Sequence, residues 1–446
     1  MSNTHTDKLK GIPVEILNFD TTNGTKYTPS ITATLNIDNS VIREISQTKI
    51  SSTQHTPAYF VTPGFINAHA HWLMLGGSSL REAVDLIEKN PEEMKQRALI
   101  NAQKTAQMGI TTVCDKGPPG RKNAPQILNQ IKEYFHENNP NNPNNDNNGR
   151  NVIPRTFASH WTISCPGGFA DVFLQAVSTK QELLSKLEEL RTSGSELIKF
   201  ILETELDANY EYKVVVSDEL LSAAVDFART HNMRVSAHAK GTLGIDACLR
   251  HGIAGIEHAL QATNAQIALL EERNIFVGLT LEGFECRIKH AVENREDTNT
   301  MRVVEYEWAA ATRLATKLAH FHSDERNSNS TNGTNSTNSA SNVLFASDAG
   351  SHSTPHASLR ELMLMRKFGF SPTDIFRAAT WNGARFLNQQ NNIGKVARGY
   401  QADLIFWNTN PLLLSELEWE RLNKHIAGVM VGERWAKLPS HLSSHY

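Results

Sequence analysis

The sequence has few cysteines and no excess of charge of either sign. Its four cysteines, Cys114, Cys165, Cys248 and Cys286, are spread over 446 residues without a CxxC pair, which argues against a disulfide-stapled secreted domain. The 44 Lys and Arg residues nearly balance the 47 Asp and Glu residues. This balance gives no general reason to expect nucleic acid or an anionic membrane as a partner, and it favours a small-molecule substrate.

Long apolar runs are also missing. No uncharged apolar run approaches the roughly 18 residues that are needed to span a bilayer. Residues 1–8 lack the charged and then apolar pattern of a secretory signal. We therefore expect a cytoplasmic protein without a membrane partner.

Two tracts of the chain have a composition unlike the rest. Residues 138–148 are almost all Asn and Pro, and residues 323–342 are mostly Ser, Asn, Thr and Gly. Such compositions cannot bury enough apolar surface to offset the entropy of ordering. We predict disordered surface insertions near 138–149 and 323–342 rather than domain linkers, because the same strand-and-helix alternation resumes after each tract.

Short apolar runs alternate with amphipathic segments through the middle of the chain, which is typical of parallel βα units. The predicted strands are residues 65–68, 111–114, 156–159, 197–201, 234–237, 253–256, 275–279 and 343–346. The predicted helices include residues 92–108, 180–191, 218–231, 264–273 and 302–321. Eight such strands indicate a (β/α)8 barrel, whose functional groups should lie at the C-terminal ends of the strands.

The two ends of the chain have a different pattern. Segments such as residues 31–37 and 426–431 alternate between apolar and other side chains, as half-buried strands do. We predict that residues 1–62 and 395–446 pair into one small composite β-sandwich domain. The barrel would then occupy residues 63–394.

Two histidines follow the first predicted barrel strand. His69 and His71 are two residues apart, so on a strand both imidazoles point to the same side, as a metal site requires. An HxH pair alone is a weak signal in a chain with 18 histidines, and for an isolated pair a structural or surface role is favoured.

Four further polar residues lie where the barrel hypothesis places a site. His238, His258 and Asp348 end the fifth, sixth and eighth strands, and Lys199 lies inside the apolar fourth strand. A lone residue of this kind is more often a core histidine or a helix cap. An unpaired ammonium among apolar neighbours is costly, however, and the agreement of separate strands favours a shared metal site.

Together these residues resemble the amidohydrolase superfamily over nearly the whole chain. The similarity is carried by residues 63–71, 109–113, 235–241, 255–258, 347–350, 378–384 and 399–404. It implies that two divalent metal ions are bound by His69, His71, Lys199, His238, His258 and Asp348, with Lys199 as the bridging lysine of the binuclear members. It also implies the composite β domain formed by the chain ends.

The lysine has a chemical rationale in such a site. A neutral amine can take up carbon dioxide, and the resulting carbamate on Lys199 would bridge two cations. The alternative is an ordinary buried ion pair of Lys199 with Glu203, Glu205 or Asp348. Zinc suits imidazole and carboxylate ligands best, although iron, manganese and cobalt stay open.

The expected reaction is hydrolysis of a C–N bond in an amide, peptide-like molecule or cyclic amide. A metal-bridging hydroxide would attack the carbonyl, with Asp348 as general base and then general acid. Mononuclear deaminases of the superfamily usually carry glutamate where this chain has Gly241, which favours a binuclear hydrolase. The chain looks most like prolidase-like and imidazolonepropionase-related members, but Phe169 stands where the prolidase-like subset usually has histidine.

Several residues near the strand ends are candidates for substrate contacts. His160 and His352 could face the pocket, with structural or solvent-facing roles as equally good accounts. Tyr210 could close over the site, although loop packing is favoured. Asp115, after the second strand, could orient a ligand histidine or cap a helix.

Two other functions remain open at this point. A lactone, ester or phosphoester hydrolase could use the same dimetal site, because selectivity resides in the loops. A noncatalytic scaffold with this fold would not need the full ligand set. The sequence is compatible with a homo-oligomer and does not identify the substrate.

Overall fold

The computed structural model describes residues 14–19, 28–47, 59–77, 80–119, 122–137, 152–170, 174–327, 342–354, 356 and 358–439. The predicted insertion near 138–149 lies outside the described residues, as does 328–341 of the second one. All four cysteines are free, as expected. In the described part of the chain, no helix has an apolar stretch long enough to traverse a bilayer.

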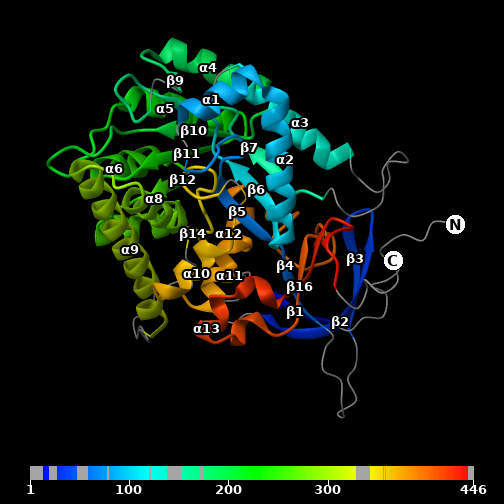
Figure 1. Cartoon of the computed structure of the whole chain (residues 1–446). Helices are drawn as coiled ribbons and strands as arrows, with labels where there is room; N and C mark the ends of the chain where they lie inside the picture. Colours follow the sequence, from blue (N-terminus) through cyan, green and yellow to red (C-terminus); the bar gives the residue numbers. More distant parts are fainter. Residues whose placement is uncertain are drawn as a thin grey trace.

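Parallel strands form a closed barrel at the centre of the molecule (Figure 1). The strands are β5 (Phe65–Ala70), β6 (Ile110–Asp115), β7 (Arg155–Ala158), β8 (Thr162–Ser164), β10 (Leu197–Ile201), β11 (Arg234–Ala239), β12 (Gly255–His258), β13 (Phe276–Gly278) and β14 (Val343–Leu344). A short strand, β9 (Gln175–Ala176), extends the sheet beyond β8. The predicted barrel fold is confirmed, and each predicted barrel strand overlaps an observed one.

The barrel consists of two sheets that meet at both edges. One contains β5, β6 and β7, and the other runs from β14 to β8 and β9. At one seam the Ala68 amide donates to the Phe345 carbonyl at 2.8 Å, and the Asp348 amide donates to the His69 carbonyl at 2.9 Å. At the other, three residues join β7, which overlaps the third predicted strand, to β8, which the sequence pattern did not predict.

Helices surround the barrel. They are α1 (Leu80–Lys89), α2 (Pro91–Gln107), α3 (Ala124–Glu137), α4 (Lys180–Thr192), α5 (Asp218–Thr230), α6 (Thr242–His251), α7 (Asn264–Glu272), α8 (Leu281–Glu293), α9 (Thr298–Asn327), α10 (Arg360–Lys367), α11 (Pro372–Ala379), α12 (Trp381–Phe386) and α13 (Glu416–Trp419). Helix α4 shows the local logic, because Thr179 and Glu182 form a capping box and Leu183, Leu187 and Leu190 are buried on one face. Helix α9 extends to Asn327, so the first residues of the predicted 323–342 insertion are helical.

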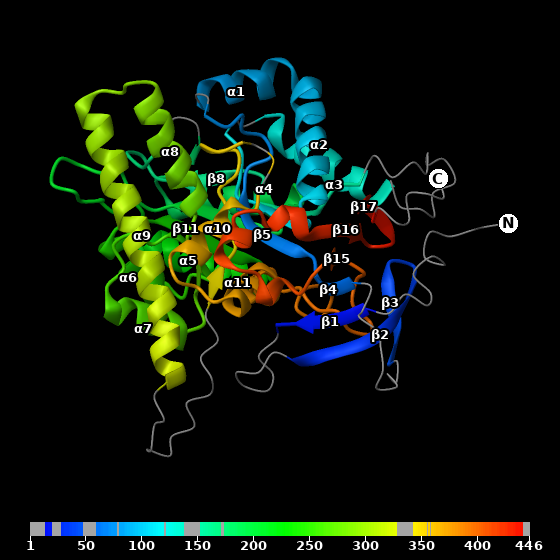
Figure 2. The ribbon, with the colours of Figure 1, turned by 60° about the horizontal axis from the view of Figure 1, so that its bottom comes forward.

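Strands from both ends of the chain form a separate seven-stranded sheet beside the barrel (Figure 2). Its order is β17 (Arg434–Lys437), β16 (Ile426–Val431), β15 (Leu404–Trp407), β4 (Tyr59–Pro63), β1 (Val14–Asn18), β2 (Thr28–Asp38) and β3 (Val41–Gln47). β4 pairs in parallel with β1 and antiparallel with β15, and thereby joins the two chain ends. This sheet has a core of its own, which includes Ile16, Leu35, Phe406 and Met430.

The sheet connects directly to the barrel through Gly64, which separates β4 from β5. A Cβ atom at Gly64 would lie 2.1 Å from the Thr111 hydroxyl oxygen on β6. Only glycine therefore lets the chain pass this close to β6. The constraint fixes the start of the strand that carries the two histidines.

Candidate metal centre

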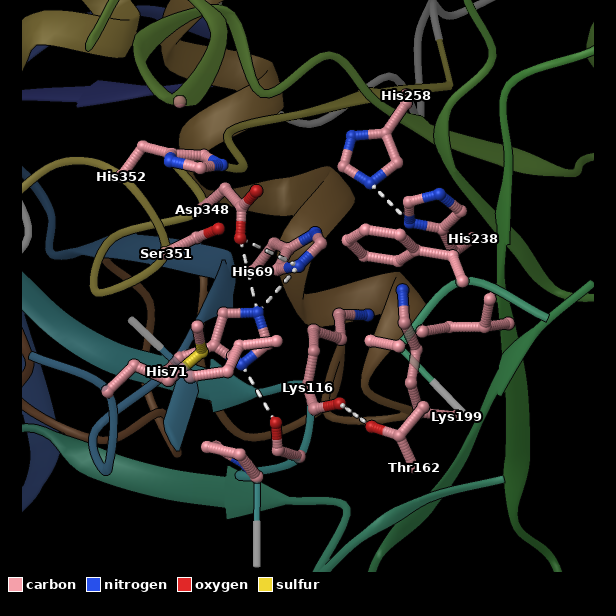
Figure 3. A pocket seen from close by; sticks show the side chains of 18 of the residues that line it. His69, His71, Lys116, Thr162, Lys199, His238, His258, Asp348, Ser351 and His352 are labelled. Atoms are coloured by element: carbon pink, nitrogen blue, oxygen red, sulfur yellow. Dashed lines mark hydrogen bonds and ion pairs between the residues drawn. The ribbon is translucent and has the colours of Figure 1, made fainter. Parts of the chain in front are cut away.

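One cavity of about 220 Å³ opens where the barrel strands end. Its lining includes all of the metal ligands expected from the sequence: His69, His71, Lys199, His238, His258 and Asp348. Figure 3 shows their side chains gathered around a common space. The structure therefore brings together residues that are up to 279 positions apart, as the span from His69 to Asp348 shows.

Three of these residues form a compact cluster of possible ligand atoms. The two Nε2 atoms of His69 and His71 lie 3.2 Å apart. The Asp348 Oδ1 atom lies 3.3 Å from His69 Nε2 and 3.1 Å from His71 Nε2. Two imidazole nitrogens and a carboxylate oxygen are suitable ligands for a divalent ion such as zinc.

The second nitrogen of each imidazole has a partner that orients the ring. His69 Nδ1 lies 2.7 Å from a Glu257 carboxylate oxygen, and His71 Nδ1 lies 2.9 Å from the Gly117 carbonyl oxygen. Both partners accept hydrogen bonds, so each Nδ1 carries the proton and each Nε2 presents a lone pair to the cavity. Three electron-rich atoms thus face one another, an arrangement that a bound cation would stabilise.

The pKa values of His69 and Asp348 support the same conclusion, whereas at His71 burial is outweighed by the hydrogen bond and charge of Asp348, which raise the pKa. Burial lowers the pKa of His69 to about 4, despite the nearby carboxylates of Glu257 and Asp348. Burial alone would raise the pKa of Asp348, but the charges and hydrogen bond of His69 and His71 lower it to about 2. At neutral pH, Asp348 is a carboxylate and His69 is a neutral imidazole, and these are the forms that bind metal.

Two of the proposed ligands have a strained backbone. Asp348 has φ of 54° and His258 has φ of 79°, both in the left-handed region. This conformation is energetically unfavourable for residues other than glycine, so it persists only where the surrounding structure enforces it. Here it follows the end of a barrel strand and directs the side chain into the cavity.

His238 and His258 form the opposite side of the site. His238 Nδ1 lies 3.0 Å from His258 Nε2, and His258 Nδ1 lies 2.7 Å from the Thr280 hydroxyl oxygen. Burial lowers the pKa of both histidines well below the usual value, so both are neutral at pH 7. The Phe169 ring stacks on His238, with ring centroids 5.4 Å apart and planes 16° apart.

Lys199 projects from β10 into the same space. It is 3% exposed, and within the described part of the chain its Nζ atom has no hydrogen-bond partner. Burial lowers its pKa to about 8. No ion pair with Glu203, Glu205 or Asp348 is present among the described residues. Glu203 instead accepts hydrogen bonds from the Lys240 and Gly241 amides, at 2.6 and 3.0 Å.

A buried charged pair behind His69 was not singled out from the sequence. Lys116 is fully buried, and its Nζ atom lies 2.8 Å from Glu257 Oε1 and 3.2 Å from the Ser236 hydroxyl oxygen. Glu257 in turn holds His69. The sequence did contain a signal for this pair, namely charged residues at the ends of two barrel strands. Such groups are seldom buried without a partner.

The three residues considered for substrate contact have different positions. His352 lines the cavity, and burial lowers its pKa to about 4. His160 is buried outside the cavity lining, with Nδ1 2.8 Å from the Ser193 hydroxyl oxygen and Nε2 3.3 Å from Lys132 Nζ. Tyr210 is 38% exposed and packs on Tyr306 outside that lining.

Among the described residues, the Asp115 carboxylate makes no hydrogen bond to a histidine side chain and caps no helix. The carboxylate accepts hydrogen bonds from the Trp72 amide at 2.7 Å and the Gly117 amide at 2.8 Å. It therefore fixes the two segments that carry His71 and the carbonyl group that His71 contacts. Asp115 therefore does not orient a ligand histidine through its ring nitrogen, because His71 Nδ1 contacts the Gly117 carbonyl oxygen instead.

The sequence model of the amidohydrolase family matches residues 60–436. This chain belongs to the amidohydrolase family. The matched region begins in β4 and ends in β17, so it includes the whole barrel and part of the composite sheet. Members of this family generally use divalent metals, and the donor atoms of this amidohydrolase fit such ions.

Individual relatives of this amidohydrolase are distant in sequence. Ochratoxinase from Aspergillus niger is 24% identical over 197 residues, which are 44% of this chain and 37% of the relative. The matched segment thus spans little more than a third of that protein.

Solved structures agree over a much longer stretch. A Xaa-Pro dipeptidase with bound methionine superposes with a TM-score of 0.72 at 19% identity, covering 95% of this chain and all (100%) of that one. Aspergillus niger ochratoxinase superposes with a TM-score of 0.71 at 17% identity, covering 96% of both chains. These likenesses show a common fold.

Proposed function

We propose that this amidohydrolase is a metal-dependent hydrolase that cleaves a C–N bond in a small molecule, either an amide, a peptide-like bond or a cyclic amide. The observation that carries the proposal is the convergence of His69 Nε2, His71 Nε2 and Asp348 Oδ1 at 3.1 to 3.3 Å. The family and the two neighbours, named as a dipeptidase and an ochratoxinase, support a hydrolase.

The residues divide into two sets of ligands in this proposal. His69, His71 and Asp348 would hold one divalent ion, and His238 and His258 would hold a second, with zinc as the best match to imidazole and carboxylate. Bound ions of this kind polarise a carbonyl group and lower the pKa of water. The partnered Nδ1 atoms of His69 and His71 keep their rings oriented for this task.

Lys199 would join the two sets as a carbamate. The neutral amine would attack carbon dioxide, form an N–C bond and release one proton. The buried Nζ atom without a hydrogen-bond partner supports this step, and so does burial, which lowers the pKa of Lys199 to about 8 and increases the neutral fraction. The carbamate would replace a poorly solvated cation by an anion between two cation sites.

Asp348 would transfer the proton during hydrolysis. It is a carboxylate at neutral pH and faces the cavity beside His69 and His71. It would take a proton from the attacking water and deliver it to the departing amine nitrogen. The left-handed backbone at Asp348 holds the carboxylate in this position.

A substrate screen with metal analysis tests the proposal. Purified protein should contain close to two divalent ions per chain. After metal loading it should hydrolyse at least one member of a panel of N-acyl amino acids, Xaa-Pro and Xaa-Arg dipeptides and cyclic amides. Hydrolysis of only lactones or phosphoesters would assign a different reaction to the site, and protein without metal or activity would fit a noncatalytic scaffold.

The carbamate has a separate test. Protein prepared with bicarbonate and zinc should show a mass increase equal to one carbon dioxide in native mass spectrometry, or the corresponding density on Lys199 in a crystal. An unmodified Lys199 in an active two-metal enzyme would reject the carbamate and leave the rest of the proposal intact.

A further inference from the structure

Besides Lys199 and Lys116, which is paired with Glu257, two further cationic side chains line the cavity beside the proposed metal centre. Lys240 follows β11, and Arg287 lies in α8. Both bind the same carboxylate, Glu307 on α9. Lys240 Nζ lies 2.7 Å from Glu307 Oε1, and Arg287 Nη1 makes a short contact with Glu307 Oε2. The Tyr212 hydroxyl donates to Glu307 Oε1 at 2.8 Å.

This cluster carries one uncompensated positive charge, because two cations share one carboxylate. Asp348 is the only acidic residue among the described residues that line the cavity, and it faces the histidines. Glu203 is fully buried behind the Lys240 main chain and does not line the cavity. His352 is neutral at pH 7, because burial lowers its pKa to about 4.

Both cations have donors to spare. A lysine ammonium has three N–H groups and a guanidinium has five. The structure gives the Lys240 and Arg287 side chains, among the described residues, hydrogen bonds to Glu307 alone. The Lys240 side chain is only 9% exposed and the Arg287 side chain 23%. Since both line the cavity, an anion inside it is the natural partner for their remaining donors.

Both cations follow closely along the chain after residues that face the metal centre and line the same cavity. Lys240 is two residues beyond His238 on the same strand end. Arg287 is one helical turn after Gly283, where a Cβ atom would lie 3.3 Å from Asp348 Oδ2. One turn of helix is about 5.4 Å. In an N-acyl amino acid the carboxylate carbon is two bonds from the scissile nitrogen, so both groups of one substrate would be reached.

We infer that Lys240 and Arg287 bind a carboxylate of the substrate next to the scissile C–N bond, which makes N-acyl amino acids and dipeptides with a free carboxylate the substrate class. The inference rests on the proposed function of the same site. The apolar cavity wall, which includes Leu174, Phe169 and Phe284, matches a substrate with an apolar body. Charge-assisted pairing of guanidinium and ammonium with a carboxylate supplies the specificity.

The competing account is that Lys240, Glu307 and Arg287 only fasten α9 to the barrel. The two accounts differ in what each substitution does. A purely structural cluster loses stability whichever member is changed. A carboxylate-binding site loses affinity for anions when a cation is removed, but keeps that affinity when Glu307 is neutralised and both cations remain.

Binding of two probes without a C–N bond separates these accounts by isothermal titration calorimetry on the metal-loaded protein. The probes are 3-phenylpropanoate and its neutral counterpart 3-phenylpropan-1-ol. Wild-type protein should bind the acid at least about tenfold more tightly than the alcohol. Lys240→Met and Arg287→Met should each weaken acid binding about tenfold and leave alcohol binding unchanged, because each removes a charged donor.

Three controls complete the experiment. Arg287→Lys keeps the charge and Glu307→Gln keeps both cations, so both should retain the preference for the acid. Lys289→Met changes a lysine on the same helix that is 56% exposed and paired with Glu285, and it should bind both probes like wild type. Equal affinity of wild type for the two probes, or equal losses for acid and alcohol in the Lys240→Met and Arg287→Met variants, would overturn the inference. Because neither probe can be hydrolysed, these results do not depend on whether the protein cleaves amides.

Discussion

The two sides of the candidate metal centre are supported in different ways. On one side, His69 and His71 each have a hydrogen-bonded Nδ1 atom, and the Asp348 amide is tied to the His69 carbonyl. On the other side, Lys199 has a buried amine without a hydrogen-bond partner among the described residues. The first side is held in place by the protein itself, whereas the second lacks a group that would satisfy Lys199.

The source of this difference is the buried network behind the first side. Lys116 and Ser236 contact Glu257, and Glu257 contacts His69. A cation and a hydroxyl group thus compensate the buried carboxylate, which in turn sets the tautomer of the histidine. Among the described residues, Lys199 has no hydrogen bond of this kind, and burial lowers its pKa although the charges of Glu257 and Asp348 act in the opposite direction.

The strongest test of the first side is Asp348→Asn. The amide retains the size of the side chain but cannot accept a proton from water. We expect turnover to fall by about 10³-fold or more, since general acid–base catalysis contributes on that order, with metal still bound by the histidines. Steady-state kinetics together with metal analysis would show this, and near-normal turnover would remove the proton-transfer role.

Glu257→Gln removes the charge that orients His69. We expect affinity for the first ion to fall by about 10- to 100-fold, as is usual when a partner behind a ligand histidine is lost. Chelator competition with zinc would measure the change.

The matched control for Glu257→Gln is Asp403→Asn. Asp403 is also buried and accepts a hydrogen bond from the Gly432 amide in the composite sheet. This control should keep the metal affinity of wild type. Equal zinc affinity of Glu257→Gln and wild type would show that the buried network does not prepare His69 for metal.

Lys199→Met tests the second side, with opposite effects in the two metal states. Without metal, methionine removes a buried amine that has no partner, so the unfolding free energy should rise by about 1–3 kcal/mol. With zinc, the same variant should lose the second ion and fall below wild type. Urea unfolding with chelator and with zinc would measure both changes. A loss of stability in both states would mean that Lys199 already has a stabilising partner in the metal-free protein.

The amino-acid pattern was sufficient to predict the barrel and the convergence of the proposed ligands. The two-residue period of β structure predicted that His69 and His71 point to one side, and Lys199 stands out in an apolar run. The rest depends on backbone geometry that side-chain patterns do not encode. Glu257 and His258 are adjacent, yet His258 lines the cavity while Glu257 holds His69 from behind, and the backbone is in the left-handed region at His258.

His160 is a second case in which the sequence pattern did not predict the position of a side chain. Its place after the third predicted strand suggested a position in the pocket. Instead β7 ends at Ala158, a further strand, β8, begins at Thr162, and in the connection between them His160 contacts Lys132 and Ser193. A strand that ends early changes the direction of every side chain after it, and sequence periodicity cannot locate such a break.

The smallest effect that we expect concerns His160, which is buried away from both sides of the metal centre. Burial lowers the pKa of His160 to about 3, with Lys132 as a second cause. Below pH 6.5 the unfolded chain therefore takes up a proton that the folded protein does not. Stability should decline as the pH falls from 6.5 toward 3, by up to about 1.4 kcal/mol per pH unit from this group.

His160→Gln should remove this component and leave hydrolysis unchanged. Glutamine keeps a polar group between Lys132 and Ser193 but does not titrate, so between pH 6.5 and pH 5 the variant should lose about 2 kcal/mol less unfolding free energy than wild type. Urea unfolding at both pH values would measure the difference, and kcat/KM at pH 7.5 should match wild type. A tenfold fall in kcat/KM with an unchanged pH dependence of stability would contradict both expectations for His160.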